Sequence, residues 1–65
     1  MKVERWDGMV ESDTTPGCVW WHLTVVDKGS KRGQLFDAPA DTDEASLIAM
    51  GLVRYKERYP QSEIQ

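Results

Sequence analysis

The fold is decided by residues 18–26, which read Cys18-Val19-Trp20-Trp21-His22-Leu23-Thr24-Val25-Val26. Successive side chains of a β-strand point to opposite faces, so as a strand this stretch divides into two sets. One set is wholly apolar and consists of Val19, Trp21, Leu23 and Val25. The other set consists of Cys18, Trp20, His22 and Thr24. The second face thus displays a large aromatic side chain where small proteins usually expose polar groups, and this predicts a contact surface.

Composition predicts one folded domain over residues 1–65, with 40% hydrophobic residues and three tryptophans. A chain of this size buries only about 60% of its unfolded surface, so a thin core is expected. The single cysteine cannot form an internal disulfide, which favours a reducing compartment. The first residues lack the pattern of a signal peptide, and no apolar run approaches the roughly 18 residues of a membrane span. We therefore expect a cytoplasmic protein.

Short extended segments are expected on both sides of the central strand. Residues 1–12 predict a hairpin around Asp7-Gly8, although the simplest register would oppose Glu4 and Glu11, so a longer loop or another register stays open. Residues 13–17 have the composition of a turn. Residues 27–33 predict a polar hairpin tip, followed by a short strand at 34–36.

The C-terminal part predicts a helix from Thr42 to Tyr59, which Pro60 ends. Asp41 and Glu44 have the spacing of a capping box. The residues expected to face the sheet are Ala45, Ile48, Leu52, Tyr55 and Tyr59, with Ala49 at the edge and with Leu47 and Met50 outside. The predicted fold is α+β: a small antiparallel sheet of three or four strands with one C-terminal helix packed on one face.

Catalytic and metal chemistry find little support in the sequence. Cys18 and His22, the one thiol and the one imidazole, would lie roughly 13 Å apart on a strand, too far for a nucleophilic pair. They supply two of the four ligands that structural zinc needs. The acidic residues lack the spacing of a calcium loop, and residues 28–33 lack that of a phosphate-binding loop. We predict a protein that is not an enzyme and binds no metal or cofactor.

Four carboxylates, Asp37, Asp41, Asp43 and Glu44, gather where the helix is expected to begin. One interpretation is structural, because acidic side chains there cap exposed amides and complement the helix dipole. The other is phosphate mimicry, in which the carboxylates occupy arginine and lysine sites of a nucleic-acid-binding partner.

The aromatic residues of the second sheet face also allow two interpretations. Trp20 and His22 would be joined by Phe36 if Leu35 faces the helix, and by Trp6 in a suitable register of the first strand. Such a cluster is either an exposed interface with another protein or a minor core under the N-terminal hairpin. As an interface, it would bind a partner through Trp20, His22 and Phe36.

A short acidic chain that lacks catalytic residues and joins a small antiparallel sheet to one helix resembles the phage-encoded inhibitors of bacterial defence called anti-CRISPR proteins. The resemblance lies in size and character over the whole chain and transfers no residue roles. It implies a protein that acts in the host cell cytoplasm, where it binds a CRISPR effector subunit and blocks DNA recognition or nuclease recruitment.

Two alternatives remain beside this leading hypothesis of a non-enzymatic inhibitor. The first is a small DNA-binding or transcriptional regulator that contacts phosphates through Lys28, Lys31, Arg32, Arg54 and Arg58. The net charge of −3 argues against general binding of nucleic acid, because a polyphosphate requires clustered basic residues. The second is a structural subunit that forms a homodimer through the second sheet face.

Overall fold

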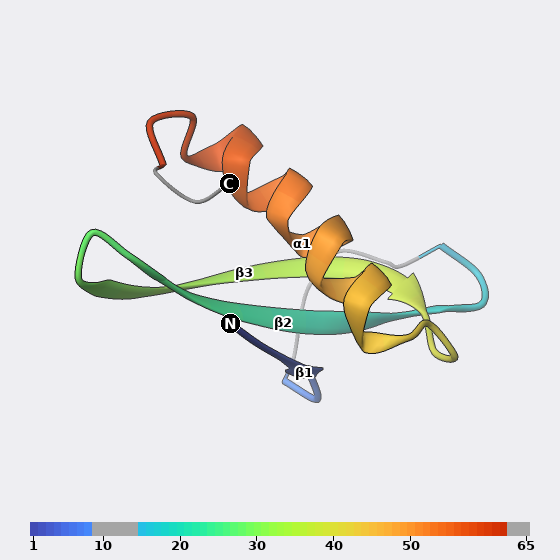
Figure 1. Ribbon diagram of the computed structural model, residues 1–65. Helices are drawn as coiled ribbons and strands as arrows, with labels where there is room; N and C mark the ends of the chain where they lie inside the picture. The colour runs from blue at the N-terminus through green and yellow to red at the C-terminus, as the bar shows by residue number, and fades with distance from the viewer. Residues whose placement is uncertain (9–14, 63–65) are drawn as a thin grey trace.

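A computed structural model describes residues 1–8 and 15–62 of the chain (Figure 1). Its elements are the strands β1 (Lys2–Arg5), β2 (Cys18–Asp27) and β3 (Ser30–Pro39) and the helix α1 (Glu44–Arg58). The strands form one antiparallel sheet in the order β1-β2-β3. The helix crosses one face of this sheet. The predicted α+β fold is confirmed, with three strands in the described residues.

β2 and β3 form a longer hairpin than the sequence indicated. Their pairing continues to Asp27 and Ser30, so only Lys28 and Gly29 form the turn. Both turn residues have positive φ, 53° and 79°, which is the geometry of the two-residue turns that match the twist of paired strands. The predicted loop over 27–33 was therefore wrong. Most of these residues belong to strands, because after the two-residue turn the pairing of β2 and β3 begins directly.

β1 pairs with β2, with Glu4 opposite His22 and Val3 opposite Leu23. The return strand expected over residues 9–12, and with it Glu11, lies outside the described residues. This register places Lys2 and Glu4 on the same sheet face as His22, because directly opposed residues share a face.

The two faces of β2 differ as their alternation predicts. Leu23 and Val25 are 0% and 1% exposed and lie on the face that the helix covers. The buried core consists of Leu23, Val25, Phe36, Ala38, Leu47 and Tyr55, with Val3, Trp21, Ile48, Leu52 and Tyr59 packed around it. The indole of Trp21 also donates a hydrogen bond of 3.3 Å to the carbonyl of Ala38.

The helix presents a different stripe to the sheet from the one expected. Leu47, Gly51 and Tyr55 are buried, whereas Ala45 is exposed, so the predictions for Leu47 and Ala45 were wrong. Gly51 explains this difference. A Cβ at this position would lie 2.8 Å from Cδ2 of Leu23 and 2.9 Å from Cε1 of Phe36. Because this position has no side chain, the helix backbone approaches the sheet there, and Ile48 and Leu52 lie on the flanks.

A buried hydrogen bond joins the end of β2 to the helix. The hydroxyl of Tyr55 donates to Oδ2 of Asp27 over 2.7 Å, and Asp27 is only 5% exposed. Burial first, and then the hydrogen bond to Asp27 and its negative charge, raise the pKa of Tyr55 above the ordinary value of 10.0. The neutral phenol is therefore the form that the folded state stabilises.

We expect this contribution to stability to be complete below about pH 10 and to be lost as pH rises through the raised pKa of Tyr55. Urea midpoints measured between about pH 7 and pH 11 test this. The Tyr55→Phe variant should be less stable than wild type at neutral pH, because the Asp27 carboxylate loses a donor. It should also show a smaller fall at alkaline pH. An equal alkaline fall in both proteins would contradict this assignment.

No helix within residues 1–8 and 15–62 is long and apolar enough to cross a membrane.

Candidate protein-binding face

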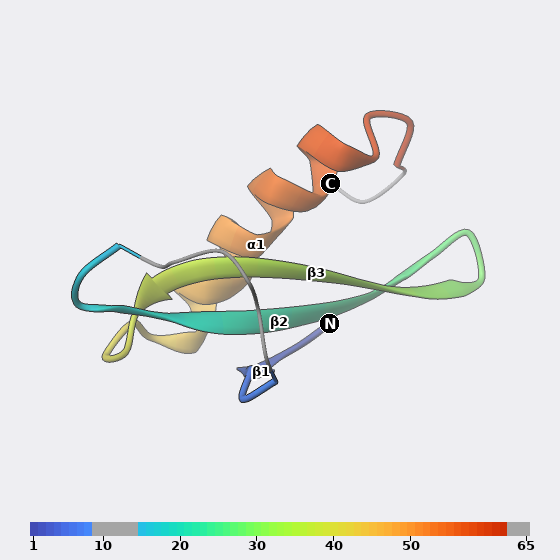
Figure 2. The same ribbon diagram turned by 180° about the vertical axis from the view of Figure 1, so that it is seen from behind.

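The face of the sheet turned away from α1 is the candidate site. Figures 1 and 2 show the helix on one side of the sheet that the three strands form. Strand pairing assigns these central side chains to the second face: Glu4, Trp20, His22, Leu35 and Asp37. We call this surface the Trp20 face. Trp20, His22 and Leu35 are half-buried there.

Trp6 and His22 form a stacked pair on this face. Their ring centroids lie 5.4 Å apart with the planes tilted by 33°. The backbone N–H of Trp6 donates to the carbonyl of Trp20 over 3.0 Å, which fixes the chain just beyond β1. Trp6 remains 39% exposed. The expectation that Trp6 reaches this face is therefore confirmed.

Gly33 makes room for the imidazole of His22. A Cβ at this position would overlap Nε2 of His22 and lie 2.8 Å from its Cε1. Oγ1 of Thr24 is 3.4 Å from Nδ1 of the same ring. His22 is thus held between the Trp6 ring and the backbone of β3. Sequence reasoning missed this role of Gly33, although a glycine within a strand is itself a sign of close approach.

Asp37 lies directly opposite Trp20 on the neighbouring strand, so the two residues share the Trp20 face. Oγ1 of Thr15 donates to Oδ2 of Asp37 over 3.5 Å. The structure thus brings together three of the predicted site residues: Trp20, His22 and Asp37.

Phe36 does not belong to this surface. It pairs with Trp21, is 3% exposed and packs in the core under α1. Its predicted place beside Trp20 was wrong, because the register puts Phe36 on the helix side and Leu35 on the Trp20 face.

The remaining acidic residues, Asp41, Asp43 and Glu44, are exposed beyond the end of β3. Asp43, rather than Asp41, caps the helix: its carboxylate accepts from the backbone N–H of Ser46 over 3.1 Å and from its hydroxyl over 2.7 Å. These hydrogen bonds, the one from the hydroxyl first, lower the pKa of Asp43. The predicted Asp41–Glu44 capping box was therefore wrong. The carboxylate of Asp43 is already engaged as the N-cap of α1.

Asp41 and Glu44 are exposed carboxylates of this segment that do not serve as the N-cap of the helix. The ion pairs among the described residues are Lys2–Glu4, Arg5–Asp7 and Arg54–Glu57. Neither Asp41 nor Glu44 takes part in them. An approaching partner can thus engage both carboxylates without breaking an ion pair in the described part of the chain.

Basic residues gather at the other end of the helix. Lys28, Arg32 and Arg58 line one pocket where the β2–β3 turn meets the residues after α1. Arg54 instead pairs with Glu57 at 3.7 Å. Figure 1 shows α1 running from the acidic segment towards the β2–β3 turn, so the charges separate along the helix.

Metal and catalytic arrangements are limited by the same geometry. Within residues 1–8 and 15–62, no three His, Cys, Asp or Glu side chains gather closely enough to hold a metal ion. Cys18 and His22 lie four residues apart on the extended strand β2.

No protein-family model, curated protein or solved structure matches the chain.

Proposed function

We propose that the chain is a non-enzymatic binding protein that inhibits a nucleic-acid-binding effector complex by covering its basic surface. The observation that carries this proposal is the pairing of Trp20 with Asp37 on the face opposite α1. It places one carboxylate directly beside the aromatic contact surface, and Asp41 and Glu44 follow in the chain beyond the end of β3. The proposed contact thus combines stacking groups and Asp37 on the Trp20 face with the exposed carboxylates of the segment that leads from β3 into α1.

The aromatic residues supply the larger part of the binding energy in this proposal. Central tryptophan and tyrosine anchors typically cost 2 kcal/mol or more when truncated, whereas rim charges contribute less. Trp6 and His22 are already stacked, so fewer rotamers need to be fixed on binding. The Trp20 face therefore anchors the partner.

The carboxylates of Asp41 and Glu44 orient the approach. They take the places of phosphates against arginine and lysine side chains of the effector, and such charges act chiefly on the association rate. The target class that we propose is a CRISPR effector complex, whose guide–target channel is lined with basic residues. The protein then acts as a partial DNA mimic.

The test is a mobility-shift assay of target-DNA binding by purified CRISPR effectors, with the protein in excess. Wild type should reduce DNA binding by its target effector. The Asp41→Lys, Glu44→Lys variant should inhibit less than wild type. Inhibition by the wild-type protein should weaken as the salt concentration rises. Asp43 is left intact because it caps the helix. The control is Lys28→Glu, Lys31→Glu, which also changes two exposed charges and should inhibit like wild type.

Three results would overturn this proposal. If no effector is inhibited, the target class is wrong. If the folded Asp41→Lys, Glu44→Lys variant inhibits fully, the acidic segment is not a phosphate mimic. If the protein alone shifts duplex DNA, and Lys28→Glu, Lys31→Glu abolishes that shift, the DNA-binding alternative holds instead.

A further inference from the structure

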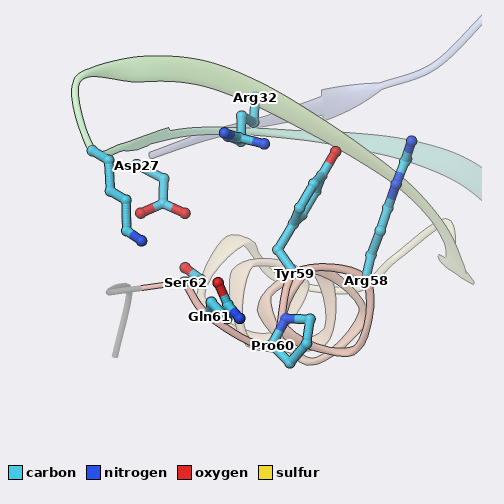
Figure 3. A pocket seen from close by; sticks show the side chains of 8 residues that line it. Asp27, Arg32, Arg58, Tyr59, Pro60, Gln61 and Ser62 are labelled. Carbon is cyan, nitrogen blue, oxygen red and sulfur yellow. The ribbon is translucent and has the colours of Figure 1, made fainter.

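A pocket lies at the basic end of the molecule, away from the acidic segment. The pocket has a volume of about 350 Å³, which falls within the range of small-ligand sites. Its walls come from the β2–β3 hairpin on one side and from the residues after α1 on the other (Figure 3). The charged and aromatic residues that line it are Asp27, Lys28, Arg32, Arg58 and Tyr59.

The charges that line this pocket favour an anion. Three cationic residues, Lys28, Arg32 and Arg58, line the pocket together with one carboxylate, that of Asp27. Asp27 is buried and accepts the hydrogen bond of Tyr55. The C-terminus of α1 adds roughly half a negative charge. The net charge of the pocket lining nevertheless remains positive. This balance stands out in a chain of net charge −3.

Tyr59 holds two of the cations in place. The guanidinium carbon of Arg32 lies 4.9 Å from the centroid of the Tyr59 ring, and that of Arg58 lies 5.4 Å from it. Figure 3 shows the ring standing between the two arginine side chains. Stacking fixes a guanidinium but leaves its N–H donors available for a ligand. Neither arginine takes part in the ion pairs of residues 1–8 and 15–62.

We propose that this pocket binds a phosphate group, with Arg32 donating hydrogen bonds to its oxygens, Lys28 adding charge from the turn and Arg58 adding charge from the far side of the Tyr59 ring. Arginine suits this role because its planar donors match phosphate oxygens. The buried Asp27 carboxylate excludes anions from the base of the pocket, so the phosphate lies near the mouth. This site is independent of the Trp20 face.

The experiment is a titration of ¹⁵N-labelled protein with inorganic phosphate, followed by amide and arginine side-chain NMR signals. At about 10 mM phosphate, which nearly saturates a site with a dissociation constant of about 1 mM, signals of Lys28, Arg32 and Tyr59 should shift together. The Arg32→Gln variant should bind phosphate about tenfold more weakly, since one hydrogen bond to a charged group contributes about a tenfold change in affinity. Arg58→Gln should weaken binding less than Arg32→Gln, because the Tyr59 ring separates Arg58 from the phosphate and leaves it a charge effect alone.

The control is Arg5→Gln, which makes the same charge change on β1, outside the pocket, and should bind like wild type. Parallel titrations with adenosine monophosphate and with duplex DNA identify the source of the phosphate. Tighter binding of the mononucleotide assigns a free phosphomonoester, and tighter binding of DNA assigns the backbone of nucleic acid. Absence of phosphate-induced shifts in wild type, or wild-type affinity for phosphate in the Arg32→Gln variant, would overturn the proposal.

Discussion

Replacing Leu23 with alanine is expected to lower the free energy of unfolding by about 2 to 5 kcal/mol. Leu23 is 0% exposed at the centre of β2, where it meets Gly51 of the helix. Removal of its side chain leaves a cavity between β2 and α1. The rigid helix backbone, which lies close to the sheet at Gly51, cannot move to fill this cavity. A chain of 65 residues has a total stability of about 3 to 10 kcal/mol, so the variant should be near unfolding.

Urea denaturation followed by tryptophan fluorescence measures this change, and thermal melting covers the case in which the variant is partly unfolded without urea. Val26→Ala is the matched control, because Val26 lies on the same strand and is 59% exposed. It should change stability by less than about 0.5 kcal/mol. Equal midpoints for Leu23→Ala and Val26→Ala, with unchanged m-values, would show that the core is not where the structure places it.

The central strand β2 was predictable because its strongest signal is local. Apolar residues at every second position of β2 specify a strand with one buried face, whatever the partner strands are. The same alternation identified Trp20 and His22 as residues of the opposite face. These features depend on period alone, so sequence reasoning could find them.

Features that depend on a register between distant segments could not be found in this way. Phe36 and Leu35 exchange faces if β3 slips by one residue, and nothing in residues 34–36 decides between the two. Likewise, the helical wheel weighted large side chains and overlooked Gly51, whose contribution is the close approach of two backbones. The rotation of the helix, and with it the burial of Leu47, follows from that approach.

The candidate site was predicted in its residue types and less well in its arrangement. Asp41 and Asp43 both precede the helix, and both have a side-chain carboxylate of the kind that caps a helix. The turn that starts at Pro39 places Asp43, not Asp41, at the N-cap position. The carbonyl of Pro39 accepts from the backbone N–H and the hydroxyl of Thr42, which ends the turn just before Asp43. The stacking of Trp6 on His22 depends on the β1–β2 register and had no signal of its own.

Replacing Trp20 is expected to have the largest effect on function. The Trp20→Thr variant should bind the inhibited effector about 30-fold more weakly or worse, because loss of an aromatic anchor costs about 2 kcal/mol or more. Threonine is chosen because it is favoured in strands, so β2 should keep its pairing. The half-buried position of Trp20 makes a check of folding necessary. Far-ultraviolet circular dichroism and a urea midpoint provide it.

Val26→Thr is the matched control for binding. It lies on β2 with its side chain on the same face as Trp20 but at the other end of the strand, opposite Lys31. It should bind like wild type. Sedimentation of wild type and Trp20→Thr tests the dimer hypothesis: a wild-type homodimer that Trp20→Thr dissociates would assign this face to self-association and contradict effector binding through it.

The most direct test of the Trp20 face as the inhibitory surface is calorimetric titration of the inhibited effector complex with wild type, Trp20→Thr and Val26→Thr. We predict equal dissociation constants for wild type and Val26→Thr, and a dissociation constant at least about 30-fold higher for folded Trp20→Thr. A folded Trp20→Thr variant that binds the effector as tightly as wild type would contradict this account.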